Sequence, residues 1–124
     1  MKIIIKTKNL ELTESLNNFI ENKFYGLKKF INILKREDKI GKTLAEVFVE
    51  VEKETMHHRK GEIFRVKSGV YLPGREIISR ARADDLQKAI IKAKDELRLE
   101  IEKYKFKNID KNRRQRRKTK NIIL

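Results

Sequence analysis

The sequence predicts an α+β domain of order β-α-β-β-β-α, in which a four-stranded sheet carries two helices on one face. An apolar stripe at helical spacing near the N-terminus predicts the first helix, and a second such stripe after residue 84 predicts the last. Between them, three stretches alternate apolar and polar residues as half-buried strands do. The 124 residues correspond to one small domain.

The first strand is predicted over Lys2–Thr7, which is rich in isoleucine. Thr13 is then expected to cap the N-terminus of one helix spanning residues 13–34, with Glu14 in its first turn. The apolar residues of this segment recur at spacings of three, four and seven: Leu16, Phe19, Ile20, Leu27, Phe30 and Ile31. Residues 36–43 are polar, contain a glycine and are expected to form a loop.

The three middle strands are predicted over residues 44–53, 62–72 and 75–83. Alternation places Glu50 and Glu52 on the solvent side of the first of them, and Arg65 and Lys67 on the solvent side of the second. Pro73 and Gly74 suit a tight turn between the last two strands. We expect the face of the sheet that the helices leave open to be polar.

Asp84 is expected to cap the second helix, with Gln87 completing a capping box. Its apolar stripe extends from Leu86 to Tyr104, so we expect a helix over residues 85–106. Residues 108–121 have almost nothing apolar to bury and are expected to be disordered. The expected organisation is therefore a folded domain over residues 1–106 and a basic tail over 107–124.

The net charge of +14 is concentrated in two places. Residues 106–124 carry eight Lys and Arg against one acid, and residues 57–82 carry seven against two. This distribution is typical of proteins that bind a polyphosphate, most often nucleic acid. The chain has no cysteine, no apolar run long enough for a signal peptide and none approaching a membrane span, so we expect a soluble cytoplasmic protein that contacts no membrane.

The sequence indicates no catalytic site. The two histidines, His57 and His58, are adjacent in an expected loop without partners at metal-ligand or general-base spacing. No phosphate-binding loop, dinucleotide fingerprint or nucleophile elbow is present. Glu50 and Glu52 are read as a solvated strand face. We therefore expect no enzyme activity, no cofactor, no metal and no small-molecule substrate.

The basic residues favour structured RNA recognised through its backbone and shape. Arg80 and Arg82 share a strand face about 7 Å apart, near the spacing of successive phosphates. Tyr71 is the only good strand candidate for base stacking, which argues against sequence-specific reading of single strands. The candidate RNA-binding residues are Lys8, Lys23, Lys28, Lys29, His58, Arg59, Lys60, Arg75, Arg80, Arg82, Lys88, Lys92, Lys103, Arg113, Arg114, Arg116 and Arg117.

Several short motifs resemble the family of ribosome hibernation-promoting factors, also called ribosome-associated inhibitor proteins, over residues 1–105. They are Lys8-Asn9-Leu10-Glu11-Leu12-Thr13, Arg59-Lys60-Gly61, Leu72-Pro73-Gly74, and the spaced set Asp85, Ala89, Ile90, Asp95 and Leu97. The chain departs from the family pattern at Gln87, Ile91, Glu96, Leu99 and Glu100, so the family's helix contacts at 96, 99 and 100 are not carried over. Only a tail follows the domain, which resembles the short form of the family.

The resemblance implies that the protein enters the channel between the head and body of the small (30S) subunit, in the 70S ribosome. There it would contact 16S ribosomal RNA, overlap the paths of messenger RNA and of aminoacyl- and peptidyl-site transfer RNA, and stop translation under stress. We expect the protein to be a monomer when free. The alternative is another structured-RNA binder, such as a ribosomal or ribosome-assembly protein.

Overall fold

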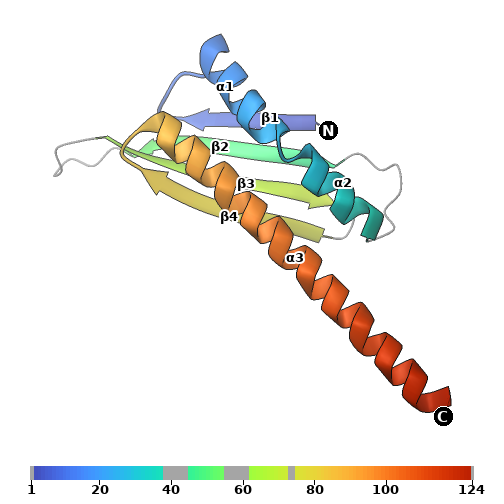
Figure 1. The fold of residues 1–124 in the computed structure, drawn as a ribbon. Helices are drawn as coiled ribbons and strands as arrows, with labels where there is room; N and C mark the ends of the chain where they lie inside the picture. The colour runs from blue at the N-terminus through green and yellow to red at the C-terminus, as the bar shows by residue number, and fades with distance from the viewer. Residues whose placement is uncertain (1, 38–44, 55–61, 73–74, 124) are drawn as a thin grey trace.

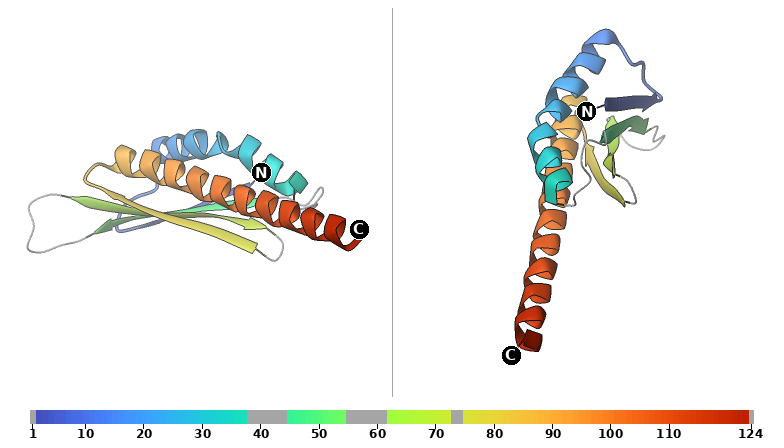
Figure 2. Two further views of the ribbon diagram at one scale, coloured as in Figure 1. Left: turned by 60° about the horizontal axis from the view of Figure 1, so that its bottom comes forward. Right: turned by 90° about the vertical axis from the view of Figure 1, so that its right-hand side faces the viewer.

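The computed structural model describes residues 2–37, 45–54, 62–72 and 75–123, with backbone alone for 34–37 and 105–123. Its elements are β1 (Lys2–Lys8), α1 (Glu14–Tyr25), α2 (Lys28–Glu37), β2 (Glu46–Glu54), β3 (Ile63–Leu72), β4 (Arg75–Ala83) and α3 (Leu86–Ile123). All three helices lie on one face of a single sheet (Figures 1 and 2). The predicted α+β class, with the helices on one face, is confirmed.

The four strands lie side by side in the order β1-β2-β3-β4. β1 runs parallel to β2, and the other two neighbouring pairs are antiparallel. A parallel pair cannot be joined by a hairpin, and α1 and α2 form the crossover between β1 and β2. The chain then returns through β3 and β4, which places α3 over the far half of the sheet (Figure 1).

The core lies between the helices and the inner face of the sheet. α1 and α2, with the turn between them, contribute Ile20, Phe24, Leu27 and Ile31, and α3 contributes Ala89, Ile90, Ala93, Leu97 and Ile101, all at most 2% exposed. The inward strand residues include Val47, Val49, Val51, Val66 and Val70. These are the positions that the alternation and the helical stripes predict, although the first stripe omitted Phe24.

The prediction of a single helix over residues 13–34 is wrong in one respect. The structure has two helices there, α1 and α2, which are separated at Gly26. The amide of Leu27 donates to the carbonyl oxygen of Phe24 at 3.0 Å, three residues back instead of four. Glycine has a low helix propensity, and this tighter turn changes the direction of the chain. Both Phe24 and Leu27 are thereby buried. α2 also includes residues 36 and 37, which were expected to lie in a loop.

The predicted cap of the first helix is confirmed, and that of the last helix is off by one residue. The hydroxyl oxygen of Thr13 accepts a hydrogen bond from the amide of Leu16 at 3.1 Å. At α3 it is Asp85, not Asp84, whose carboxylate accepts from the amide of Lys88, at 3.3 Å. The carbonyl oxygen of Asp85 also accepts the first helical bond, from Ala89. The two aspartates are adjacent, and the sequence pattern alone did not separate them.

α3 continues to Ile123, whereas we expected a helix to about residue 106 and a disordered tail after it. Its C-terminal part extends beyond the sheet, as Figure 1 shows. No glycine or proline follows Gly74, and the tail is rich in Lys and Arg, which have high helix propensity. Low apolar content removes a reason to pack, but it does not by itself end a helix. The turn expected at residues 73–74 lies outside the described residues.

Gly69 allows an aromatic ring to lie on the open face of the sheet. It pairs with Phe48 on the neighbouring strand. A Cβ atom at position 69 would overlap the Phe48 ring and lie 2.7 Å from the carbonyl oxygen of Ile77. Phe48 is consequently only 6% exposed although it points away from the helices.

Gly69→Ala is expected to lower the free energy of unfolding by about 1–3 kcal/mol, because the Phe48 ring must move off the sheet. Gly26→Ala is the matched control: the nearest atom to its Cβ would be 3.6 Å away, and its backbone is already right-handed helical. This control should be neutral or slightly stabilising. Urea unfolding of both variants measures the difference, and equal stability of the two would contradict the proposed overlap.

Candidate nucleic-acid interface

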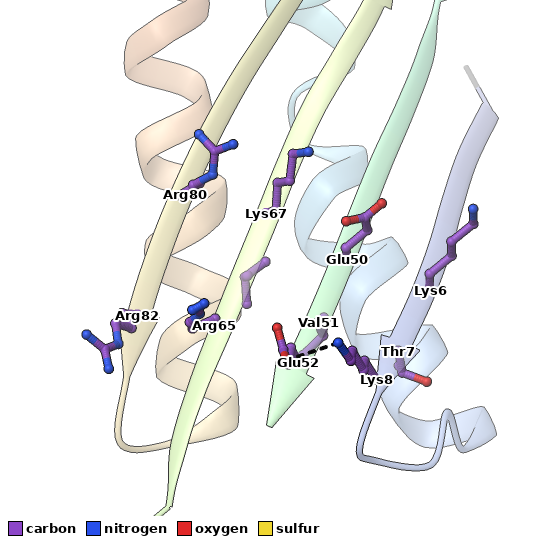
Figure 3. A pocket seen from close by; sticks show the side chains of 11 residues that line it. Lys6, Thr7, Lys8, Glu50, Val51, Glu52, Arg65, Lys67, Arg80 and Arg82 are labelled. Atoms are coloured by element: carbon purple, nitrogen blue, oxygen red, sulfur yellow. Dashed lines mark ion pairs between the residues drawn. The ribbon is translucent and has the colours of Figure 1, made fainter. Parts of the chain in front are cut away.

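The open face of the sheet carries charged side chains in two rows that run across all four strands. Because paired residues point to the same face, the register aligns Lys6, Glu50, Lys67 and Arg80 in one row. The next row contains Lys8, Glu52, Arg65 and Arg82. Figure 3 shows these side chains on the same side of the sheet.

These rows line a groove of about 710 Å³. Its lining consists of Lys6, Thr7, Lys8, Glu50, Val51, Glu52, Arg65, Val66, Lys67, Arg80 and Arg82. Six of these side chains are basic and two are acidic, so the groove has an excess of positive charge. We call it the basic groove.

Glu54 holds two arginines of the basic groove. Its carboxylate lies 2.8 Å from Nε of Arg65 and 2.8 Å from Nη2 of Arg82. The Glu54 side chain is only 9% exposed, so these charge-assisted contacts are partly shielded from water. Arg65 and Arg82 are therefore positioned by the protein and partly neutralised by it.

Lys67 and Arg80 have a different environment. Among the residues that the structure describes, neither forms an ion pair. The Lys67 ammonium group lies 5.9 Å from the centre of the Phe48 ring, and Arg80 is exposed. Nearer β1, Lys8 and Glu52 form a longer ion pair of 3.8 Å. Lys67 and Arg80 are direct cross-strand partners, and with Lys6 they are the cations of the groove that form no ion pair in the described part of the chain.

The structure brings three of the predicted RNA-binding residues into the basic groove: Lys8, Arg80 and Arg82. Lys92 borders it, because its ammonium group donates to the carbonyl oxygen of Arg82 at 3.4 Å. Lys88 lies one turn earlier on α3 and is exposed. Arg82 on β4 and Lys92 on α3 are thus in contact, and RNA binding by these five residues stays a prediction.

Other predicted residues lie on the helices or, for Arg75, at the start of β4, and none of them lines the basic groove. Lys23, Lys28 and Lys29 each place an ammonium group 5.1–5.5 Å from an aromatic ring, of Phe19, Tyr25 and Phe30 respectively. The Arg75 guanidinium group covers the ring of Tyr104 at 5.0 Å. Lys103 lies 3.3 Å from a carboxylate oxygen of Glu100.

The remaining predicted residues have no described side chains. His58, Arg59 and Lys60 lie outside the described residues. Arg113, Arg114, Arg116 and Arg117 lie in α3, where only the backbone is described. The groove also contains three basic residues that the predicted set omitted: Lys6, Arg65 and Lys67. The outward direction of Arg65 and Lys67 was evident from alternation, but their alignment with Arg80 and Arg82 depends on the register between strands.

Other kinds of site find little support in the described part of the chain. No group of three or more metal-ligating side chains comes together there. Nor does any helix within the described ranges have the length and apolar character needed to cross a membrane. The basic groove on the open face of this α+β domain has a charge that suits a polyanionic ligand.

Comparison with known proteins assigns the family. Residues 3–109 match the model of the sigma 54 modulation protein / S30EA ribosomal protein family, and the chain belongs to this family. No curated protein sequence matches the chain.

Two solved structures share the fold. The N-terminal domain of Protein Y from Thermus thermophilus is 24% identical, with a TM-score of 0.56, and the match covers 84% of this chain and 99% of that domain. A ribosomal subunit interface protein from Coxiella burnetii is 18% identical, with a TM-score of 0.61, and the match covers 85% and 98%.

Arg80→Ala is expected to weaken binding to a short RNA by about 1.5–3 kcal/mol, because it removes a charge-assisted hydrogen bond that no described partner replaces. Arg82→Ala should cost less than about 1 kcal/mol, since Glu54 already engages its guanidinium group. Fluorescence anisotropy at several salt concentrations measures both. The slope of log affinity against log salt should fall by roughly one for Arg80→Ala.

Arg98→Ala provides the control for a loss of charge. Arg98 lies on α3, pairs with Glu102 at 3.3 Å and does not line the basic groove. Its removal should leave RNA affinity nearly unchanged. A larger loss for Arg82→Ala than for Arg80→Ala would show that the Glu54 pair does not restrain Arg82.

Proposed function

We propose that this chain is a ribosome hibernation factor. It binds 16S ribosomal RNA in the channel between the head and body of the small subunit, within the 70S ribosome. In that position it occludes messenger RNA and the aminoacyl- and peptidyl-site transfer RNAs, and it inhibits translation under stress. It acts as a cytoplasmic monomer and by occupancy, without catalysing a reaction.

The basic groove is the observation that carries this proposal. Two charged rows about 7 Å apart suit the spacing of phosphates along an RNA strand. The four cations Arg65, Lys67, Arg80 and Arg82 lie on adjacent strands, so they form a compact cluster rather than a dispersed charge. Family membership supports the ribosome as the source of the RNA, because the family description includes a ribosomal protein. One of the similar structures is likewise named a ribosomal subunit interface protein.

The last part of α3 would add to this binding. Residues 106–124 carry eight basic residues against one acid, and the helix extends away from the sheet (Figure 2). We propose that residues 1–106 form the ribosome-binding domain and that residues 107–124 supply additional, mostly electrostatic affinity. Charge of this density attracts phosphates over a distance set by the Debye length, about 8 Å at physiological salt.

A second candidate function is that of a structured-RNA binder in ribosome assembly. The observation in its favour is the chemistry of the basic groove, because lysine and arginine contacts to phosphate do not by themselves distinguish a mature ribosome from a precursor. The two candidates differ in whether the protein and translating ligands exclude each other.

Preloading ribosomes with messenger RNA and a peptidyl-site transfer RNA is expected to prevent binding of this protein, because both need the same channel. Added protein should in turn reduce the binding of labelled transfer RNA and saturate at about one copy per ribosome, as expected for occupancy rather than turnover. Co-sedimentation with labelled transfer RNA measures both directions.

A Lys67→Ala/Arg80→Ala variant tests whether the basic groove makes this contact, and it should bind ribosomes more weakly. Its melting temperature should be nearly unchanged, because both side chains are on the open face. If the protein and peptidyl-site transfer RNA occupy the same small subunit together at full occupancy, occlusion is wrong. The assembly function then becomes the better account.

A further inference from the structure

An aromatic pair lies beside the basic groove on the same open face. The rings of Phe48 and Tyr71 are stacked, with centroids 4.7 Å apart and planes inclined by 29°. Phe48 is almost covered, whereas Tyr71 is 43% exposed. Exposed aromatic rings next to a phosphate-binding groove are the usual means of holding an unpaired base, because every base has a face that can stack.

The pair is held in place by the sheet. Phe48 lies over Gly69, where a side chain would displace it, and so it supports Tyr71 from one side. Tyr71 is cross-strand partner to Glu46 on one side and to Glu76 on the other. Partial burial, with the neighbouring carboxylates of Glu76, Glu50 and Glu46, raises the pKa of the Tyr71 phenol above its ordinary value. The ring is therefore neutral at physiological pH and presents an uncharged stacking face.

The open face has opposite charge at its two ends. Around Tyr71 the register places Lys2, Glu46 and Glu76, so acids outnumber bases there. At the other end, the basic groove has more basic than acidic side chains. A phosphate is therefore repelled from the aromatic end and attracted to the groove. A nucleotide lying on this face has one favourable orientation, with its base toward Tyr71 and its phosphate toward Lys67.

Lys67 connects the two ends. Its ammonium group lies 5.9 Å from the Phe48 ring centre, and its cross-strand partner is Arg80. A phosphate held by Lys67 and Arg80 would place the attached sugar and base over the aromatic pair. Lys67 thus lies over the Phe48 ring, on which the exposed ring of Tyr71 stacks.

We propose that Tyr71, supported by Phe48, is a stacking site for an unpaired nucleobase, and that the open face of the sheet binds a single-stranded segment of RNA. This inference rests on the proposed function in that it takes RNA as the ligand of the basic groove. It adds that this RNA is single-stranded where it crosses the sheet. Binding to the backbone of an RNA duplex would not need an unpaired base.

The test compares RNA with a polyanion that has no bases. Tyr71→Ala is expected to weaken binding of an oligoadenylate of about eight nucleotides by ~5- to 100-fold, as loss of one aromatic stack does. Binding of inorganic polyphosphate should stay unchanged, because the basic groove is intact. Tyr71→Phe keeps the ring and should bind both ligands as the unaltered protein does. Fluorescence anisotropy and competition supply the affinities.

Tyr25→Ala is the matched control. Tyr25 is a second exposed tyrosine, 55% accessible, and it lies on α1 away from the open face. Its loss should leave oligoadenylate binding unchanged. A 2-aminopurine placed within the oligonucleotide should be quenched by the unaltered protein and by Tyr71→Phe, and less by Tyr71→Ala.

Two outcomes overturn the inference. Equal oligoadenylate binding by Tyr71→Ala and the unaltered protein, with a lowered melting temperature, would make Tyr71 only a cover for Phe48. A parallel loss of polyphosphate binding would show that the variant had disturbed the groove. Either result leaves the proposed function standing if the unaltered protein still competes with transfer RNA on ribosomes. If the unaltered protein does not compete with transfer RNA, but Tyr71→Ala still weakens oligoadenylate binding, the proposed function is wrong and the stacking site stands.

Discussion

The register between β2, β3 and β4 is the constraint on which the rest of this molecule depends. Side chains alternate between the two faces of a strand, so the same pairing that turns Val49, Val66 and Ala81 toward the helices turns Glu50, Lys67 and Arg80 outward. A slip of one residue in any strand would bury charge and expose the core. The fold and the basic groove are therefore specified by the same interactions, and neither can change without the other.

Crowding positive charge on one face is unfavourable unless something compensates for it, and Glu54 provides part of the compensation. Its nearly covered carboxylate engages Arg65 and Arg82 and leaves Lys67 and Arg80 for a ligand. Lys67 in turn lies over Phe48, whose ring depends on the absence of a side chain at Gly69. Charge, aromatic packing and a glycine are thus coupled on the open face.

Local patterns predicted the class of fold well, and they failed where the answer depended on geometry between elements. Alternation identified β2, β3 and β4 within two residues, and the Thr13 cap was correct. The division at Gly26 was missed because the spacing of apolar residues is the same on both sides of the turn. The pattern therefore could not distinguish one long helix from two short ones. The basic groove was found only in part: Arg80 and Arg82 were chosen from one strand, whereas Lys6 comes from a strand distant in sequence whose neighbours only the sheet order reveals.

The central claim is that the open face of the sheet, rather than the helical layer, contacts RNA on the ribosome. The absence of cysteine allows a direct test with single thiols introduced by Glu50→Cys, in the basic groove, and Glu21→Cys, exposed on α1. Both changes remove one carboxylate, so their effects on charge match. The account predicts that ribosome binding slows maleimide labelling strongly for Glu50→Cys and little for Glu21→Cys. Protection of Glu21→Cys, with Glu50→Cys labelled at the same rate with and without ribosomes, would contradict it.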